Sequence, residues 1–310
     1  MATTVTRVIR VGTRGSKLAL RQTGLVVAEL SAAHPGIEFQ TAPISTAGDR
    51  DKQTPLERVG VAVFVKELEA ALDDGRVDIA VHSLKDMPSE LPPGFTLAAL
   101  PGRADPRDVL VNRWQAVLDD LPAGARIGTG SPRRRAQLLA ARRDLDVVPI
   151  RGNVDTRLAK ALGDGTGYDG AVLAAAGLDR LGPSRAVVAV PLDPERFVPA
   201  AGQGTLAIET RTADGDLTRI AAVIDHTPTR IAATAERAVL ARIGGGCASA
   251  VSAYATVAGD TVTVRAFASD ADGRRPILLT RAGPVAEAAA IGAALADEMI
   301  AGGAKELILE

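Results

Sequence analysis

Short apolar runs and amphipathic stretches alternate along the first hundred residues. Arg7–Thr13 and Glu38–Ser45 have the aliphatic composition of strands, and Val77–His82 reads as a short buried strand. Ser16–Ala33 and Phe64–Asp74 repeat apolar residues at helical spacing, and Ser16 stands where an N-cap is expected. The alternation of strands and helices predicts a mostly parallel sheet with helices on its faces.

The pattern restarts near residue 126. RIGT at 126–129 leads into GSPRRRAQLLAAR, as RVGT near the start of the chain leads into RGSKLALRQTG. Both passages run from a strand through a Gly/Ser turn into an arginine-bearing helix, which predicts two domains of similar design that present helix N-termini to a shared site. The repeat is short, so chance similarity stays open. Pro101–Arg107 and Pro199–Gly204 would be the two crossings between these domains, as in a hinge.

The pattern after about residue 226 is different. Thr229–Arg242 predicts a helix, Gly244–Cys247 a tight loop, and Val285–Ala301 a closing helix. Between them, SAVSAYATVA, TVTVRAFASD and RPILLTRAG alternate as two or three strands. Strands followed by a helix, without a strand–helix–strand alternation, indicate a small α+β domain.

Composition narrows the class of protein. The chain has 310 residues, enough for two or three domains, with 46% hydrophobic and 24% charged residues. A net charge of −1 argues against a nucleic-acid binder, no apolar run is long enough to span a bilayer, and the N-terminus lacks the apolar region of a secretory signal. We therefore expect a cytoplasmic protein.

Cysteine and arginine usage adds two further constraints. The single cysteine excludes an internal disulfide, and no Cys/His cluster suggests a metal site, so we expect no metal. The basic residues comprise 30 arginines and 6 lysines. Codon bias can explain that total but not the placement of several arginines at strand ends beside Gly, Ser and Thr, where anions bind.

The clearest basic stretch is Gly128–Leu138, GTGSPRRRAQL. Small residues let a ligand approach the backbone, the helix N-terminus adds positive potential, and Arg133 and Arg134 supply guanidinium groups that can grip a carboxylate or phosphate. A solvated basic helix face is the alternative. Arg14 and Ser16 occupy the matching loop of the first half, which favours an anion site.

A third basic turn lies at RGNVDTR. Arg151 and Arg157 flank it, and either Asn153 or Asp155 could cap the helix that begins there. Three strand-to-helix turns with arginine together predict one pocket for a multiply anionic small molecule.

An acidic residue stands among cations at Val81–Pro88, VHSLKDMP. A buried strand ends in Ser83, Lys85 and Asp86 before Met-Pro forces a turn. Asp86 could be only a turn or cap residue. Alternatively, a carboxylate in a cation-lined cleft stays ionised and can stabilise positive charge that develops on a substrate.

The only cysteine follows three glycines, at Gly244–Cys247. A lone cysteine is commonly a small buried apolar residue, whereas the glycines favour an exposed loop tip where a thiol can be modified. No histidine partner is visible nearby, so the sequence does not support a papain-like nucleophile. An attachment point fits better.

Taken in order, these stretches resemble the porphobilinogen deaminase (hydroxymethylbilane synthase) family, over essentially the whole chain. The matching strings are RVGTRGSKLAL, ISTAGDR, FVKELEAALDDGRVDIAVHSLKDMP, IGTGSPRRRAQL, IRGNVDTRL, AAAGLDRLG, PAAGQGTLAIE and the GGGC loop. The resemblance implies an α/β fold with two periplasmic-binding-protein-like lobes of mostly parallel sheets, plus a small α+β C-terminal domain. We place these domains at 1–101 with 203–225, at 106–199, and at 226–310.

The resemblance also implies the site. Cys247 matches the cysteine that holds a dipyrromethane cofactor covalently, and Asp86 matches the catalytic aspartate, which also contacts the cofactor. Gln22 and Gln203 lie in matching cleft stretches. The residues matched to those that hold the carboxylate side chains of cofactor and substrate are Arg14, Ser16, Ser83, Lys85, Thr129, Ser131, Arg133, Arg134, Arg151, Arg157 and Arg180.

The implied reaction joins four porphobilinogen molecules head to tail with loss of ammonia, and water then releases hydroxymethylbilane. The implied partner is this small substrate, with no nucleic acid, no membrane and a monomeric enzyme. The sequence departs from many relatives at Val59–Val63, which lacks a loop lysine that Arg58 could replace in part, at Ala250 and at Gly130. A non-catalytic anion receptor and a cysteine-dependent hydrolase are the competing interpretations.

Overall fold

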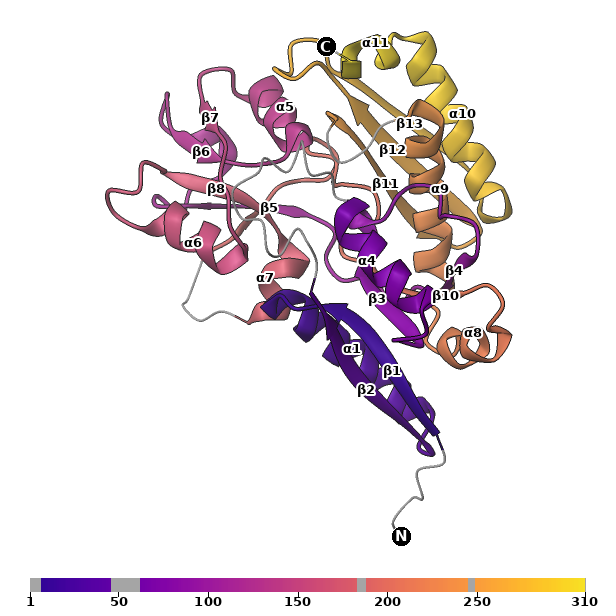
Figure 1. Ribbon diagram of the computed structural model, residues 1–310. Helices are drawn as coiled ribbons and strands as arrows, with labels where there is room; N and C mark the ends of the chain where they lie inside the picture. Colours follow the sequence, from indigo (N-terminus) through magenta and orange to yellow (C-terminus); the bar gives the residue numbers. More distant parts are fainter. Residues whose placement is uncertain (1–6, 46–61, 183–187, 245–248, 310) are drawn as a thin grey trace. The chain divides into compact units, whose positions relative to one another are not determined.

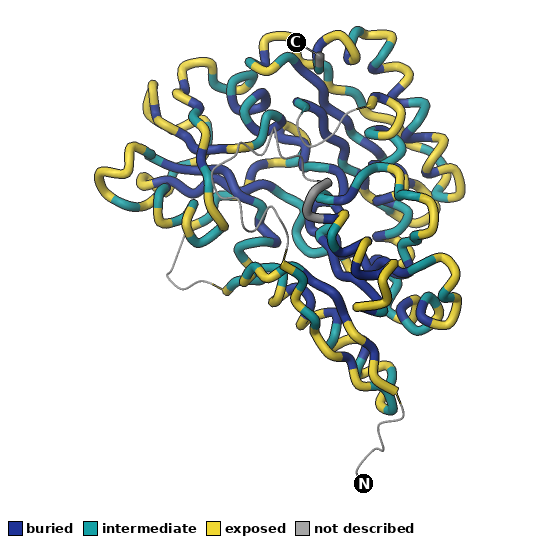
Figure 2. Tube along the Cα trace, in the orientation of Figure 1, coloured by how far each residue is buried: buried dark blue, intermediate teal, exposed yellow. Residues whose placement is uncertain are grey.

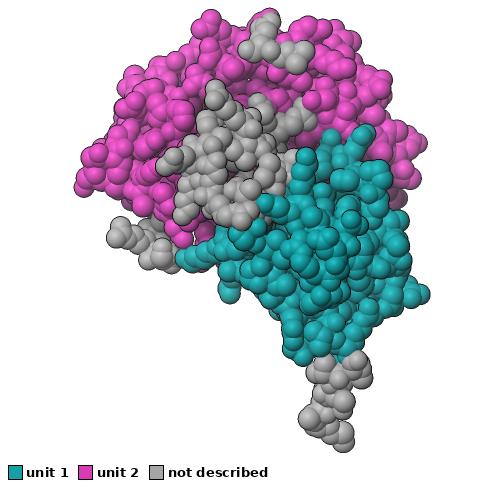
Figure 3. Space-filling model, in the orientation of Figure 1, with its two compact units in different colours: residues 1–104, 205–230 teal, residues 105–204, 231–310 magenta. Residues whose placement is uncertain are grey.

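The computed structural model describes residues 7–45, 62–182, 188–244 and 249–309. Contacts between residues group the chain into two compact units, which Figure 3 shows in different colours. The first comprises residues 1–104 and 205–230, and the second comprises residues 105–204 and 231–310. The chain therefore leaves the first unit once and returns to it once before residue 231.

The first unit is built on a five-stranded sheet with the order β2-β1-β3-β10-β4 (Figure 1). β10 is antiparallel to both of its neighbours, so the other four strands point the same way. Its elements are β1 (Arg7–Arg14), α1 (Lys17–Ala33), β2 (Ile37–Ile44), α4 (Ala62–Asp73), β3 (Ile79–Ser83), the 3-10 turn η1 (Leu84–Asp86), β4 (Phe95–Ala99), β10 (Leu206–Arg211) and α8 (Gly215–Ala222).

The second unit contains a sheet of the same design, with the order β7-β6-β8-β5-β9. Here β5 is the one antiparallel strand. The elements are β5 (Asp108–Asn112), η2 (Leu118–Asp120), β6 (Arg126–Gly128), α5 (Pro132–Ala141), β7 (Asp146–Val148), α6 (Val154–Leu162), β8 (Gly170–Ala174), α7 (Ala175–Leu181) and β9 (Val190–Pro191).

The two sheets repeat each other down to individual hydrogen bonds. In the first, the Arg10 backbone N–H donates to the Asp78 carboxylate at 2.7 Å, and the Asp78 N–H donates to the Arg10 carbonyl at 2.8 Å. In the second, Arg126 and Asp169 exchange the same two bonds at 2.9 and 2.8 Å. The repeat read from RVGT and RIGT is therefore structural and not a chance similarity.

The glycine of each repeat is required by close packing. A Cβ on Gly12 would lie 2.9 Å from a methyl group of Val77, and a Cβ on Gly128 would lie 2.9 Å from Ile150. Real Cβ atoms do not approach other heavy atoms so closely, so Val77 and Ile150 could not pack against these strands as they do if either glycine were a larger residue.

Apolar residues from both faces of each sheet form the cores, which appear as dark blue strands in Figure 2. In the first unit, α1 and α8 cover one face through residues such as Leu30 and Leu217, and α4 covers the other through Leu68. In the second unit, α5 packs on one face through Leu138, and α6 and α7 pack on the other. This is the layered arrangement that the alternating pattern predicts.

The C-terminal part of the second unit is an antiparallel sheet, β11-β12-β13, covered on one face by α9 and α10. Along β12, Val262, Val264 and Ala266 are fully buried and alternate with more exposed residues. The elements are α9 (Thr227–Ile243), β11 (Val251–Ala258), β12 (Thr261–Ala268), β13 (Ile277–Pro284), η3 (Val285–Glu287), α10 (Ala288–Ala301) and α11 (Ala304–Leu309).

The predicted fold class of α/β lobes with mostly parallel sheets and a small α+β C-terminal part is confirmed. The division into three domains stays a prediction, since contacts group the described chain into two units. Five strands were not predicted: β4, β5, β8, β9 and β10. Part of the Val59–Val63 loop lies outside the described residues. Among those described, no helix has the length and apolarity needed to cross a membrane.

Candidate active site

Predicted site residues of the first unit stand where β1 and β3 end. These strands are adjacent and parallel, so their carboxyl ends meet at one edge of the sheet. Arg14 is the last residue of β1, and Ser16 caps α1 by accepting a hydrogen bond from the Ala19 N–H at 3.2 Å. The carboxyl edge of such a sheet is the usual place for ligands in α/β folds.

The end of β3 places the acidic candidate at the same edge. Ser83 exchanges hydrogen bonds with the buried Gln22 side chain at 3.1 and 3.3 Å, which fixes the strand end against α1. Lys85 and Asp86 follow in the short turn η1, and both are half-buried. The Leu84 N–H donates to the Thr205 carbonyl at 3.0 Å, so the strand and the turn are tied on both sides.

The second unit has the equivalent edge after β6. Ser131 caps α5, accepting from the Arg134 N–H at 3.4 Å, and its own N–H donates to the Thr129 hydroxyl at 3.1 Å. Thr129 is buried. Two hydroxyl groups and a helix N-terminus therefore lie together at the carboxyl edge, as the sequence predicts.

Arg133 and Arg134 are buried and contact a carboxylate of the protein itself. Asp108, which is fully buried at the start of β5, accepts from Arg133 Nη1 at 2.7 Å and from Arg134 Nη2 at 2.7 Å. Burial alone would raise the pKa of Asp108, but the charges and hydrogen bonds of the two arginines hold it well below its usual range. The solvated basic helix face considered from the sequence is therefore excluded for these two arginines.

Asp108 is a residue that the sequence reasoning missed. One signal was present: RDVLVN places a carboxylate directly before a continuous apolar run, and such a run predicts a strand that is buried on both faces. A charge at that position needs a buried partner. The partner could not be chosen from the sequence, because 25 and 26 residues separate Asp108 from the two arginines.

A group of cations surrounds the next turn. Asn153 caps α6, accepting from the Thr156 N–H at 2.9 Å, which settles the choice between Asn153 and Asp155. Arg157 Nε donates to the Gly152 carbonyl at 2.8 Å. Burial first, and then the charges of Arg134 and Arg151, lower the pKa of Arg157. Like charges that lie close together at a partly buried position destabilise the folded protein unless an anion binds between them.

Of two further predicted residues, Arg180 contacts the loop before β10 and Gln203 belongs to it. Arg180 Nη2 donates to the Gly204 carbonyl at 2.6 Å, and burial lowers the pKa of Arg180. Gln203 is 1% exposed, and its Nε2 donates to the Pro106 carbonyl at 2.7 Å and to Asp108 at 2.9 Å. The contacts of Gln203 seen here are to the protein, so its role in binding substrate stays a prediction.

Cys247 lies outside the described residues. The structure describes the two elements that border it, α9 ending at Ile243 and β11 beginning at Val251. Glu236 in α9 is fully buried and accepts from the Ala255 N–H at 2.7 Å and the Gly202 N–H at 2.6 Å. Its carboxylate thus joins α9 to β11 and to the loop that carries Gln203.

A second group of buried polar side chains lies in β3 and the neighbouring β10. His82 Nε2 and Glu209 Oε2 are 2.9 Å apart, with side chains 4% and 0% exposed. Glu69 of α4 lies near them, and burial together with the charge of Glu209 raises the pKa of Glu69, against smaller opposing effects of His82 and Lys66. The carboxyl group of Glu69 therefore binds its proton more tightly in the folded protein than in the unfolded chain.

Replacing Glu69 by glutamine should stabilise the protein by about 1 kcal/mol near pH 8. Because the folded pKa of Glu69 is raised, stability falls as pH increases from the ordinary glutamate range through that raised pKa. Glutamine cannot ionise and removes this decline. Denaturant unfolding at pH 5 and pH 8 measures it, with Glu29→Gln on exposed α1 surface as the control. An equal loss of stability with pH in both variants would contradict the expectation.

The fold and the site together define a class: α/β proteins that bind a small polyanion at carboxyl edges lined with arginine, hydroxyl groups and helix N-termini. Comparison with known proteins narrows it. Residues 9–219 match the family model "Porphobilinogen deaminase, dipyromethane cofactor binding domain", and residues 230–301 match "Porphobilinogen deaminase, C-terminal domain".

Curated relatives agree over nearly the full length. The chain is 48% identical over 299 residues to the porphobilinogen deaminase of Roseiflexus sp. (strain RS-1), covering 96% of this chain and 97% of the relative. It is 44% identical over 301 residues to that of Syntrophus aciditrophicus (strain SB), covering 97% of each. A solved structure, the methionine binding protein MetQ, is similar with a TM-score of 0.41 and 12% identity, over 70% of this chain and 89% of that one. The family assignment does not depend on the last.

The chain belongs to the porphobilinogen deaminase family. It is a transferase of tetrapyrrole biosynthesis that polymerises porphobilinogen, and its cofactor is dipyrromethane. The resemblance identified from the motifs is confirmed.

Proposed function

We propose that Asp86 is the catalytic carboxylate and that the arginines of the second unit hold the carboxylates of cofactor and substrate. The observation that carries this proposal is the group Arg134, Arg151 and Arg157, in which burial first, and then the charges of Arg134 and Arg151, lower the pKa of Arg157. A ligand with several carboxylates relieves the repulsion among these charges. Arginine suits the task because its planar fork grips a carboxylate in fixed geometry.

The residues present fit a dipyrromethane, whose two pyrrole rings carry acidic side chains. Thr129, Ser131 and the arginines of the second unit supply the donors that such side chains need. Cys247 is the only cysteine and the anchor, although it lies outside the described residues. When bound, the cofactor supplies the ring carbon onto which substrate units are added.

Asp86 acts on the substrate. Porphobilinogen carries two carboxylates and an aminomethyl group, and the departure of ammonia develops positive charge on the pyrrole nitrogen. A carboxylate held in a half-buried turn at the sheet edge stabilises that charge more than water does. Arg14 and Lys85 stand in the same edge segments and are assigned to the substrate and cofactor carboxylates.

Ser16, Ser83 and Gln22 belong to the same proposed edge, and Arg133, Arg180 and Gln203 to that of the second unit. We also propose that the enzyme acts as a cytoplasmic monomer without nucleic-acid partners. The three-domain division at 1–101 with 203–225, 106–199 and 226–310 is part of the same proposal. It is supported by the three sheets of the described residues, since each of the three proposed domains contains one sheet and β10 lies in the 203–225 part of the first domain.

The intact mass of the purified protein tests this function. Protein from cells able to make porphobilinogen should be heavier than its sequence by one dipyrromethane, and brief exposure to porphobilinogen should add heavier covalent species in equal steps. A mass equal to the bare sequence, with reversible anion binding only, would instead support a non-catalytic anion receptor.

A further inference from the structure

Asp108 accepts four hydrogen bonds through its two carboxylate oxygens. Oδ1 accepts from Arg134 Nε at 3.0 Å, Arg134 Nη2 at 2.7 Å and Gln203 Nε2 at 2.9 Å, while Oδ2 accepts from Arg133 Nη1 at 2.7 Å. A carboxylate has about four lone-pair positions. The side chain is therefore fixed from three directions, and it fixes its partners in return.

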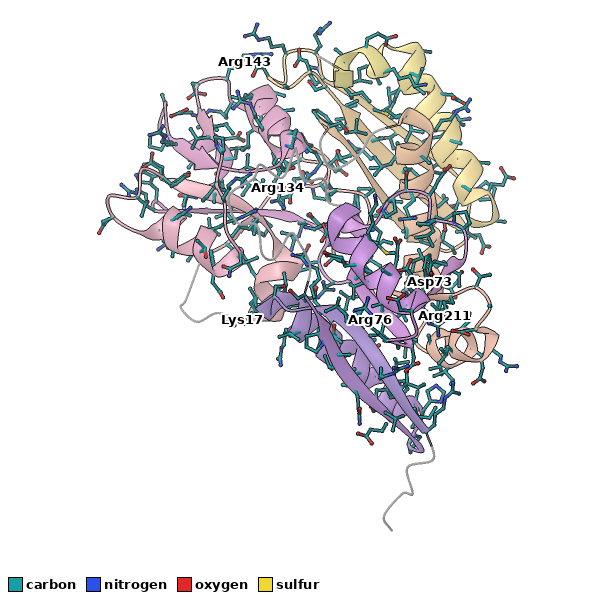
Figure 4. All side chains as sticks on the ribbon, viewed as in Figure 1. Lys17, Asp73, Arg76, Arg134, Arg143 and Arg211 are labelled. Atoms are coloured by element: carbon teal, nitrogen blue, oxygen red, sulfur yellow. The ribbon has the colours of Figure 1, made fainter. Side chains whose placement is uncertain are left out.

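The arginines are anchored at a second point as well. Arg134 Nη1 donates to the Val172 carbonyl at 3.1 Å, and Arg133 Nη1 donates to the Val198 carbonyl at 2.8 Å. Among the described residues, these bonds engage three of the five N–H groups of Arg134. These three bonds hold the guanidinium group of Arg134 in one orientation, and so they also fix the directions of its other two N–H groups. Arg134 lies on α5, the helix that Ser131 caps (Figure 4).

Asp108 also lowers the net positive charge around Arg133 and Arg134. Arg133 and Arg134 are consecutive and buried, and one carboxylate between them reduces their combined charge from two to one. Arg157 already experiences the charge of Arg134. Without Asp108, the arginines would repel one another and leave this arrangement.

We propose that Asp108 is a positioning residue of the reaction: together with Arg133 it holds Arg134 so that the two remaining N–H groups of Arg134 meet a carboxylate of the bound pyrroles. Asp108 itself touches neither substrate nor cofactor. This inference rests on the proposed function of the arginines and adds the residue through which they are oriented. Gln203, which donates to both Asp108 and the Pro106 carbonyl, completes the same support.

The test starts from the wild-type holoenzyme, which must first form covalent intermediates with porphobilinogen; if it forms none, the proposed function fails and not the inference. In Asp108→Asn, kcat/KM for porphobilinogen should fall about tenfold, as it commonly does when a group that orients a ligand-binding residue is lost. The mass spectrum should show intermediates accumulating at a different stage. Asp144→Asn, which breaks the Arg142 pair at the other end of α5, should leave that distribution unchanged.

A double-mutant cycle separates positioning from general weakening of the fold. If Asp108 acts through Arg134, then Asp108→Asn combined with Arg134→Gln should have kcat/KM within about threefold of Arg134→Gln alone. Effects that multiply independently, or an unaltered distribution of intermediates in Asp108→Asn, would overturn the proposal.

A third variant covers the case in which Asp108→Asn does not fold. Gln203→Met keeps the charge of Asp108 and both arginine contacts but removes the third donor to the carboxylate. It should shift the distribution of covalent intermediates in the same direction by a smaller amount. A wild-type distribution in folded Gln203→Met protein would then overturn the proposal.

Discussion

Asp86→Asn should lower the turnover number about 10²- to 10³-fold while the protein stays folded and retains its cofactor. Asparagine keeps the shape of the side chain but not its charge, so it can no longer stabilise positive charge on the pyrrole nitrogen. Because Asp86 is half-buried in a turn tied down by Leu84 and Met87, the substitution leaves the backbone bonds in place. Steady-state kinetics with porphobilinogen, together with the intact mass, measures the two parts separately.

Glu90→Gln is the matched control, since Glu90 is an exposed carboxylate four residues further along the same loop. It should retain full turnover. The role assigned to Asp86 would be wrong if Asp86→Asn kept substantial activity, or if it lost its cofactor and its cooperative unfolding together with its activity.

Local signals explain what the sequence predicted of the fold. Ser16 was a recognisable cap because a hydroxyl before an amphipathic run satisfies a free N–H of the first helical turn, and the structure shows this bond. Ser131 makes the same bond in the second unit but was not predicted as a cap. The repeated Gly-Thr was recognisable from the matching residues, and the structure supplies its reason, because a Cβ on Gly12 or Gly128 would collide with a neighbouring side chain. The resemblance of the motifs to a known family then supplied what local patterns cannot, the cofactor and the reaction.

Long-range pairing explains what the sequence did not predict. β10 belongs to the first sheet although it follows β3 by more than a hundred residues, and it is the antiparallel strand between β3 and β4. No periodicity within Leu206–Arg211 indicates that partner. β4 was missed for a related reason, since its short apolar segment becomes a strand only through its pairing with β10.

The partners of charged side chains are also decided by residues far away in the sequence. Three successive arginines at 133–135 look equivalent in the sequence, yet Arg133 and Arg134 are buried on Asp108, whereas Arg135 lies nearer the surface and pairs with Asp272. The helical turn gives each side chain a different direction, and only the tertiary structure decides which of them meets a carboxylate. Arginine content therefore predicts an anion site without showing which arginines serve it.

Arg157→Gln should lower kcat/KM by at least about 30-fold, because losing one partner of a charged, partly buried hydrogen-bonded pair typically costs about 2–5 kcal/mol. The same substitution should have the opposite effect on stability when no cofactor is bound. In protein with Cys247→Ala, which cannot anchor the cofactor, Arg157→Gln removes the cost of burying the charge of Arg157 and the repulsion by Arg134 and Arg151. The free energy of unfolding should then rise by about 1 kcal/mol.

Opposite signs distinguish a ligand site from a structural cation. A structural arginine would lose stability on substitution whether or not the cofactor is present, whereas a cation kept for an anionic ligand destabilises the empty protein and stabilises the loaded one. Thermal unfolding of the two cofactor-free proteins and kinetics of the two holoenzymes measure both signs. Arg143→Gln, at an exposed position just beyond α5, is the control and should change neither (Figure 4). A stability loss in cofactor-free Arg157→Gln protein would show that Arg157 supports the fold and not the bound carboxylates.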